Sequence, residues 1–340
     1  MKILIVGDVH FCSYSSILRS RGAKYSTRLE KLLESLDWVE RLAEEQDVDE
    51  EVYLGDFMDR SDVSAEEITA LRDIGWSEKP KTFIVGNHES NVSSLFFNST
   101  NALGRWHVAS KPEYVGSKGI VFLPYVTEDE RKPLQACFDE LGVDGKPIVF
   151  SHNDIKDMQV GAFVSKIGFS ISEIGETCAM FVNGHIHNGG WVSSNLLNLG
   201  NLTGQNFGED AFRYGHRVAI LDTDTMEFEF FDNPHAMNFY KVTVTDGASL
   251  GALSSLKPNA VLSVKCPESM VMETRSALDG AGDSILAYKI VCVPDQTTGQ
   301  GAEGEPSIGV DHLQRFRDYV VETLGHGDVV MHELSEVLRQ

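Results

Sequence analysis

The chain begins with the apolar run Lys2-Ile3-Leu4-Ile5-Val6, which ends in Gly7-Asp8-Val9-His10. Four more motifs each follow a short apolar run: Gly55-Asp56-Phe57-Met58-Asp59-Arg60, Gly86-Asn87-His88-Glu89, Ser151-His152 and Gly184-His185-Ile186-His187. They supply carboxylates, an amide and imidazoles, which are the ligands of two adjacent metal ions with one histidine to spare. Paired ions hydrolyse phosphate esters, so the motifs predict a dinuclear metallophosphoesterase.

The composition predicts a globular protein with one large domain and a smaller one. The chain has 340 residues, of which 42% are hydrophobic and 24% are charged. No apolar run approaches the ~20 residues that span a bilayer, and Met1 leads directly into the first run without a basic leader. The five cysteines form no CxxC pair, which argues against a disulfide framework or a zinc ribbon. We therefore expect a cytoplasmic protein without membrane contact.

The formal net charge of −22 repels nucleic acid at long range. It argues against strong DNA binding by this chain alone, but it does not exclude chemistry on DNA. If DNA is the substrate, the metal ions, local basic patches or a partner protein must hold it.

The first two thirds of the chain alternate β-rich runs with helical patterns, which favours a layered α/β fold. We expect strands at Lys2–Val6, Glu51–Leu54, Thr82–Val85, Gly119–Leu123, Ile148–Phe150 and Met180–Val182. Leucines and a valine at helical spacing predict a helix over Thr27–Glu45, and we expect Ala65–Ile74 to form a second helix of the same kind. Several motifs follow the carboxyl ends of strands, where open α/β sheets place their sites.

From about Trp191 the pattern is that of β-structure, with a hairpin of Arg217–Asp222 and Met226–Phe231. The next runs predict strand, strand, helix and strand at Phe239–Val244, Val261–Cys266, Ser269–Leu278 and Ile285–Val293. We therefore divide the chain into a main domain (1–235), a small α+β domain (236–293), a flexible linker rich in Gly and Pro (294–309) and a C-terminal helical segment (310–340).

The ligands divide between two ions, with Asp56 shared because it has two carboxylate oxygens. One ion would take Asp8, His10, Asp56 and His187, and the other would take Asp56, Asn87, His152 and His185. Mixed oxygen and nitrogen ligands suit divalent ions and argue against a thiolate site. We expect Mn²⁺, with Mg²⁺, Fe and Zn²⁺ as alternatives.

His88 follows a ligand and is free to face the substrate, so we expect it to stabilise or protonate the leaving oxygen. Asp59 would hold the His88 ring in orientation. Arg60 is assigned to substrate binding, and a structural ion pair of Arg60 with Asp59 is the alternative. The attacking group would be a metal-activated water, with no covalent intermediate.

Basic residues also cluster just after the first motif, at Arg19, Arg21, Lys24 and Arg28. They could contact phosphates beside the site, with Arg19 and Arg21 as the substrate-binding candidates. The alternative is an ordinary solvated loop.

The five motifs resemble those of the calcineurin-like metallophosphoesterase superfamily: D-x-H, G-D-x-x-D-R, G-N-H-[DE], H and G-H-x-H. The resemblance covers roughly residues 1–235. It implies a four-layer α/β/β/α sandwich with two metal ions between the sheets, and the ligand roles given above agree with it position by position.

The layout of the whole chain resembles the SbcD-like nucleases and their T4-type phage relatives, which act in double-strand-break processing and recombination. This resemblance implies a capping role for residues 236–293, a homodimer, and docking of the C-terminal helices on a coiled-coil ATPase of the SbcC type. It implies a Mn²⁺-dependent 3′→5′ exonuclease on DNA ends that also cuts single strands. Two departures are Glu89, where that branch usually has Asp, and Leu199–Gly204, where a Gly-Ser/Thr turn is usual.

Two other functions remain open. A phosphoprotein phosphatase or a small-molecule phosphodiesterase of the same superfamily is favoured by the acidic charge and by Glu89, whereas the α+β domain and the tail count against it. A non-catalytic scaffold is disfavoured because every ligand position and His88 are filled.

Overall fold

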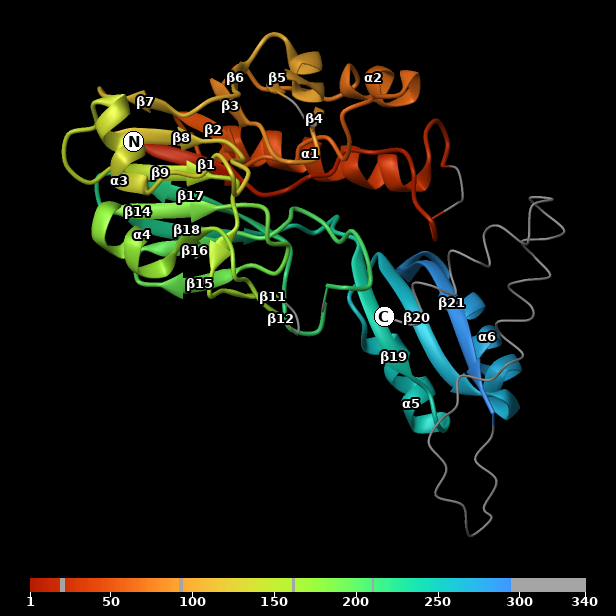
Figure 1. Ribbon diagram of the computed structural model, residues 1–340. Helices are drawn as coiled ribbons and strands as arrows, with labels where there is room; N and C mark the ends of the chain where they lie inside the picture. The colour runs from red at the N-terminus through yellow and green to blue at the C-terminus, as the bar shows by residue number, and fades with distance from the viewer. Residues whose placement is uncertain (19–21, 92–93, 161–162, 210, 295–340) are drawn as a thin grey trace, which may run out of the picture. The chain divides into compact units, whose positions relative to one another are not determined.

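The computed structural model describes residues 1–18, 22–91, 94–160, 163–209 and 211–294. Two six-stranded sheets pack face to face, and helices cover the outer face of each sheet (Figure 1). This arrangement confirms the predicted α/β sandwich.

The first sheet has the strand order β18-β17-β1-β2-β3-β6. Strands β1, β2, β3 and β6 are parallel, and β17 and β18 extend the sheet as an antiparallel hairpin. In that order the strands span Glu227–Asp232, Arg217–Asp222, Lys2–Val6, Glu50–Tyr53, Lys81–Ile84 and His107–Ala109.

The second sheet has the order β15-β16-β14-β9-β8-β7, with the four central strands parallel and an antiparallel strand at each edge. These strands span Gly190–Ser193, Leu196–Asn198, Met180–Asn183, Ile148–Ser151, Ile120–Leu123 and Glu113–Val115. Short strand pairs lie outside the sheets, at Ser90–Asn91 with Ser94–Asn98 (β4, β5), Ile155–Lys156 with Phe169–Ser170 (β10, β13) and Gln159–Val160 with Phe163–Val164 (β11, β12).

Alternation along β1 explains why the layers stack. Successive side chains of a strand point to opposite faces. Ile3 and Ile5 therefore enter the apolar cluster between the two sheets, while Leu4 and Val6 enter the cluster beneath the outer helices. A strand buried on both faces needs an unbroken apolar sequence, and this run has one.

The helices agree with the spacing of their apolar residues. The α1 helix spans Thr27–Glu45 as predicted, and the Ser26 side chain caps it by accepting the Leu29 N–H. The α2 helix ends at Leu71, earlier than the predicted Ile74, and is closed at its start by a capping box. The helices after α1 are Ala65–Leu71 (α2), Leu134–Leu141 (α3), Ile171–Thr177 (α4), Gly247–Gly251 (α5) and Val271–Gly280 (α6), and the short 3₁₀ helices are Ser99–Leu103, Ala252–Ser255, Glu268–Met270 and Gly282–Ser284.

The predicted α+β segment forms its own parallel sheet, β19-β20-β21, with strands Asn238–Thr243, Ala260–Pro267 and Ile285–Val293. It has a separate apolar cluster, yet Phe239 and Val261 pack into the main core. Residues Met1–Asp295 form one compact unit, so the boundary at 235 stays a prediction. The linker from 295 onward and the C-terminal helical segment (310–340) lie outside the described residues.

Within the part of the chain that the structure describes, no helix combines the length and the apolar character that crossing a membrane requires.

A buried ionic cluster joins α1 to the first sheet, and the sequence pattern did not predict it. Lys81 on β3 is fully buried, and its Nζ donates to Glu40 Oε2 at 2.8 Å and to Ser77 Oγ at 2.9 Å. It also contacts Glu51 Oε1. Burial raises the pKa of Glu51 to about 7, and the nearby Glu40 carboxylate adds to the increase.

Replacement of Lys81 should destabilise the fold strongly. Lys81→Ala removes the cation between two buried carboxylates and should cost ~3–5 kcal/mol in the free energy of unfolding. The matched control is Lys79→Ala, because the Lys79 partner Asp47 is exposed and such surface pairs contribute below ~1 kcal/mol. Urea unfolding of the three proteins measures the difference, and equal losses in both variants would contradict the structural role of Lys81.

The Glu51 carboxyl should make stability depend on pH. Its pKa is raised on folding, from 4.5 to about 7, so the native state keeps a proton that the unfolded chain has lost. Stability should therefore fall as the pH rises through this interval. Glu51→Gln mimics the protonated group and should flatten that fall, as measured by urea unfolding in chelator between pH 5 and pH 8. A decline of equal slope in the variant would contradict this assignment.

Candidate metal centre

The five motifs lie at one end of the sandwich, because each follows the carboxyl end of a parallel strand. The loops after β1, β2 and β3 come from the first sheet, and those after β9 and β14 come from the second. Parallel strands end at a common edge, so the two sheets bring residues from distant parts of the sequence together. The structure assembles all seven predicted metal ligands there.

The first group of donor atoms contains His10, His187 and Asp8. His10 Nε2 and His187 Nε2 are 3.1 Å apart, and Asp8 Oδ2 lies 3.9 Å from each of them. The second group contains His152, Asn87 and His185. Asn87 Oδ1 lies 3.1 Å from His152 Nε2 and 3.0 Å from His185 Nδ1.

Asp56 joins the two groups through a single oxygen. Its Oδ2 lies 3.9 Å from His10 Nε2 and 3.1 Å from His152 Nε2. Its other oxygen, Oδ1, accepts the His88 backbone N–H at 3.0 Å. Oδ1 thereby holds the third loop in place, and the role of Asp56 as the ligand shared by the two ions stays a prediction.

The donors fit divalent cations. Asp8 and Asp56 are 0% and 2% exposed, and Asp8 Oδ2 is buried without a hydrogen-bond partner among the described residues. A buried carboxylate oxygen of this kind is costly unless a cation binds it. Carboxylate, amide and imidazole donors suit Mn²⁺, Fe or Zn²⁺.

Burial and nearby opposite charges shift the pKa values of these groups. Burial would raise the pKa of Asp56, but His152 and His10 beside it lower it below its usual range. Burial would lower the pKa of His152, but the carboxylates of Asp56 and Asp8 raise it to about 9. The protein without metal therefore holds a proton on His152 at neutral pH, and metal binding must release it.

Each ligating histidine is oriented by an acceptor on its other nitrogen. His152 Nδ1 lies 2.9 Å from the Leu54 carbonyl, which can only accept, so Nδ1 carries the proton and Nε2 faces the centre. Three carboxylates accept hydrogen bonds from the other histidines in the same way. Asp59 Oδ1 lies 3.1 Å from His10 Nδ1, Asp154 Oδ1 lies 3.2 Å from His185 Nε2, and Glu209 Oε1 lies 2.9 Å from His187 Nδ1.

Sequence reasoning missed Asp154 and Glu209. Asp154 stands two residues after His152, just as His10 stands two residues after Asp8, and this spacing could have identified it. Glu209 has no such signal, because only the path of the loop after β16 brings it to His187.

The loops turn sharply at the ligands themselves. His10, Asp56 and His185 have φ values of 49°, 46° and 71°, in the left-handed region that non-glycine residues seldom adopt. A Cβ at Gly184 would lie 2.7 Å from Asp8 Oδ1, so this position needs glycine.

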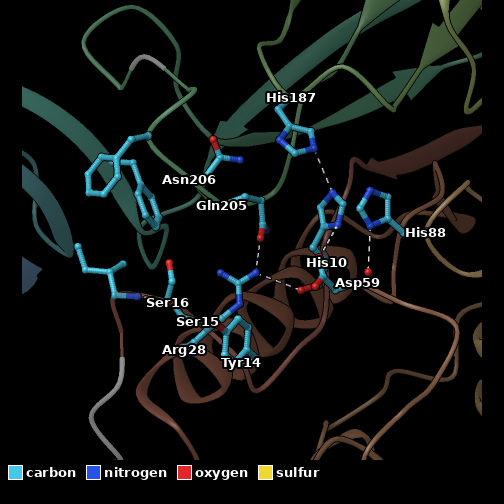
Figure 2. Close-up of a pocket in the computed structure, with 13 residues that line it drawn as sticks. His10, Tyr14, Ser15, Ser16, Arg28, Asp59, His88, His187, Gln205 and Asn206 are labelled. Atoms are coloured by element: carbon cyan, nitrogen blue, oxygen red, sulfur yellow. Dashed lines mark hydrogen bonds and ion pairs between the residues drawn. The ribbon is translucent and has the colours of Figure 1, made fainter. Parts of the chain in front are cut away.

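His88 and Asp59 are both at the centre, but their relation differs from the prediction. The Asp59 carboxylate contacts His10, and the Asp59 backbone carbonyl lies 2.9 Å from His88 Nδ1. Asp59 thus orients His88 through its backbone and His10 through its side chain. The His88 ring packs edge-on against His10 with centroids 4.8 Å apart, and 42% of its side chain is exposed (Figure 2).

Arg60, predicted to bind substrate, is not among the residues that line the pocket at the metal centre. Its Nη2 binds both carboxylate oxygens of Glu67, at 2.9 and 2.7 Å, and its Nη1 contacts Cys12 Sγ at 2.8 Å. A guanidinium held in this way is structural, but its partner is Glu67, not Asp59. Arg19 and Arg21 lie outside the described residues.

The two departures from the family pattern have structural roles. Glu89 is fully buried and accepts the N–H groups of Gly86 at 2.7 Å and Met58 at 3.0 Å, so it joins the second and third loops. In the Leu199–Gly204 segment, the Leu202 N–H donates to the Asp8 carbonyl at 2.9 Å.

Comparison with known proteins gives one family match. The family model described as calcineurin-like phosphoesterase matches residues 1–190, which is more than half of the chain. No curated protein sequence matches the chain.

Among solved structures, a dimetal phosphatase from Danio rerio is similar, with 14% identity and a TM-score of 0.40 over 68% of this chain and 99% of that one. A metallophosphoesterase from Sphaerobacter thermophilus has 16% identity and a TM-score of 0.32 over 68% and 88%. An NAD nucleotidase from Haemophilus influenzae has 11% identity and a TM-score of 0.31 over 83% and 59%. Likenesses this weak add nothing on activity.

Glu209 should support metal binding without being a ligand. Glu209→Ala removes the acceptor of His187 Nδ1 and should weaken Mn²⁺ binding ~10–100-fold. Glu227→Ala, an exposed carboxylate on β18, removes the same charge away from the centre and should leave the affinity unchanged. Calorimetric titration of chelator-treated protein with Mn²⁺ measures both, and an unaltered affinity in Glu209→Ala would refute the role.

Proposed function

This chain belongs to the calcineurin-like phosphoesterase family, and from that premise we propose that it is a Mn²⁺-dependent DNA nuclease. It would act as a 3′→5′ exonuclease on duplex ends and as an endonuclease on single strands, in the cytoplasm. In double-strand-break processing and recombination it would be the nuclease subunit beside an SbcC-type ATPase.

The observation that carries the proposal is a pocket next to the metal centre, lined by the predicted ligands His10 and His187. It has a volume of about 270 Å³, and Phe207 lines it together with the metal-centre histidines. Figure 2 shows Arg28 and Gln205 on its wall beside His10, His88 and His187. A phosphomonoester needs room for one phosphate and one leaving group. A pocket that continues beyond the centre supports a substrate with further groups next to the scissile phosphate, as in a diester chain.

The chemistry requires a proton donor for the leaving oxygen, and His88 is placed to supply it. Bound ions would supply Lewis-acid activation of the phosphoryl group and of the attacking water. His88 Nδ1–H donates to the Asp59 carbonyl, so Nε2 is the atom that gains and loses the proton. This nitrogen lies 4.0 Å from Asp56 Oδ2, beside the shared metal ligand, and the half-exposed ring can reach a substrate.

A partner is part of the proposal because the chain alone is strongly acidic. With a net charge of −22, it would depend on an ATPase for a grip on DNA. We assign that docking to the C-terminal helical segment (310–340), and we propose a homodimer as in the nucleases that the chain resembles.

A phosphatase or small-molecule phosphodiesterase is the second candidate, and the acidic charge favours it. Glu89 no longer weighs in its favour, because this side chain is buried and structural.

The nuclease should degrade end-labelled duplex DNA with Mn²⁺ but not with chelator. His88→Ala should lower the rate ~10²–10⁴-fold and retain its metal, because His88 transfers a proton and is not a ligand. His107→Ala removes an exposed histidine on β6 and serves as the control.

Hydrolysis of para-nitrophenyl phosphate in the same assay separates the candidates. If para-nitrophenyl phosphate is hydrolysed rapidly while DNA stays intact, even with the ATPase partner added, the phosphatase function replaces the nuclease function.

A further inference from the structure

Arg28 is a buried cation that forms no ion pair within the part of the chain that the structure describes. It lies in the first turn of α1 and is 4% exposed. Its Nη2 donates to the His10 carbonyl at 3.2 Å and to Gln205 Oε1, which are both neutral acceptors. Among the described residues, its Nε has no hydrogen-bond partner and no carboxylate oxygen lies within 4.0 Å of the guanidinium nitrogens.

A charge buried in this way is costly unless an anion or several hydrogen bonds compensate it. Arg60 shows how the same chain treats a structural arginine, because its guanidinium forms a bidentate pair with Glu67. Among the described residues Arg28 has no such pair: neutral acceptors hold its guanidinium in place, and the Asp59 and Glu209 carboxylates act on it only from beyond ion-pair distance. The arrangement is that of an anion site kept ready for a ligand.

Arg28 lies directly beside the metal centre. It donates to the backbone of the ligand His10, and it lines the same pocket as His10, His88 and His187. Figure 2 shows the guanidinium extending from α1 towards Gln205, on the side of the pocket next to the metal-binding histidines. An anion bound by Arg28 would therefore be a near neighbour of a phosphate held at the centre.

The remaining pocket walls suit a nucleotide. Ser15 Oγ accepts the N–H groups of Ile17 and Leu18, so its own hydroxyl proton is available to a phosphate oxygen. The exposed side chain of Tyr14 lines the same pocket, and aromatic rings of this kind stack on nucleobases.

We propose that Arg28 forms a subsite for a second phosphate of the substrate. This inference rests on the proposed function, in which the second phosphate is the one that neighbours the scissile phosphate in a DNA strand. A planar guanidinium is suited to bind two oxygens of a phosphate at once. Arg28 would thereby position a polynucleotide and distinguish it from a substrate with a single phosphate.

The test compares three ligands by calorimetry: thymidine 3′,5′-bisphosphate and the thymidine 3′- and 5′-monophosphates. All titrations use the full Mn²⁺-loaded chain in the His88→Ala background, so that turnover is slow. The bisphosphate should bind ~10–100-fold more tightly than either monophosphate, because one phosphate occupies the metal centre and the other forms charge-assisted hydrogen bonds with Arg28.

Arg28→Met should remove this preference, and Arg28→Lys should keep only part of it, because lysine retains the charge without the planar fork. Arg41→Met is the matched control, since Arg41 is an exposed arginine on the same helix, and it should leave the preference unchanged. Using the ratio of two affinities cancels any change in metal loading between variants.

If the His88→Ala chain with Arg28 unchanged binds the bisphosphate and the monophosphates with equal affinity, the proposal is overturned. This comparison does not depend on the folding of an Arg28 variant. A preference that persists in folded, metal-loaded Arg28→Met would overturn it as well. If the preference depends on Arg28 but DNA is not hydrolysed, the nuclease function fails and the second-phosphate subsite stands.

Discussion

The carboxylates of Asp8 and Asp56 are buried where water cannot stabilise them, and the surrounding structure depends on offsetting that cost. Two anions at the bottom of one site require positive charge close by. The imidazoles of His152 and His187 provide part of it as long as no metal is bound, and this is why their pKa values are raised. Two divalent ions can take over that role, so the proteins with and without metal differ chiefly in where the compensating charge lies.

The two-sheet architecture makes such a site rigid. The first sheet supplies three ligand-bearing loops and the second supplies two, so neither sheet could bind both ions alone. The acceptors behind the histidines also come from separate segments: Leu54 and Asp59 follow β2, Asp154 follows β9, and Glu209 lies in the loop after β16. The imidazoles are therefore fixed in orientation before an ion arrives, which lowers the entropy lost on binding.

The sequence predicted the central strands, the α1 helix and the residues that the structure brings together at the candidate metal centre, but not the contacts that support them. The apolar run Lys2–Val6 and the spacing of leucines in Thr27–Glu45 predicted β1 and α1 to the residue, because burial imposes a period on each. The roles of Asp59 and Arg60 were not predictable, because they depend on which atom faces a neighbour after the loops fold. Lys81, Arg28 and Glu209 are charged residues whose burial leaves no periodic signal in the chain.

The left-handed turns at His10, Asp56 and His185 restrict what evolution can place there. Aspartate, asparagine and histidine adopt this conformation more readily than most other side chains do. These are also the side chains that bind divalent ions through oxygen or nitrogen. One choice of residue therefore satisfies both the bend of the loop and the coordination of the metal. A lineage that lost the metal would still be under pressure to keep these residue types, and the motif would outlast the chemistry.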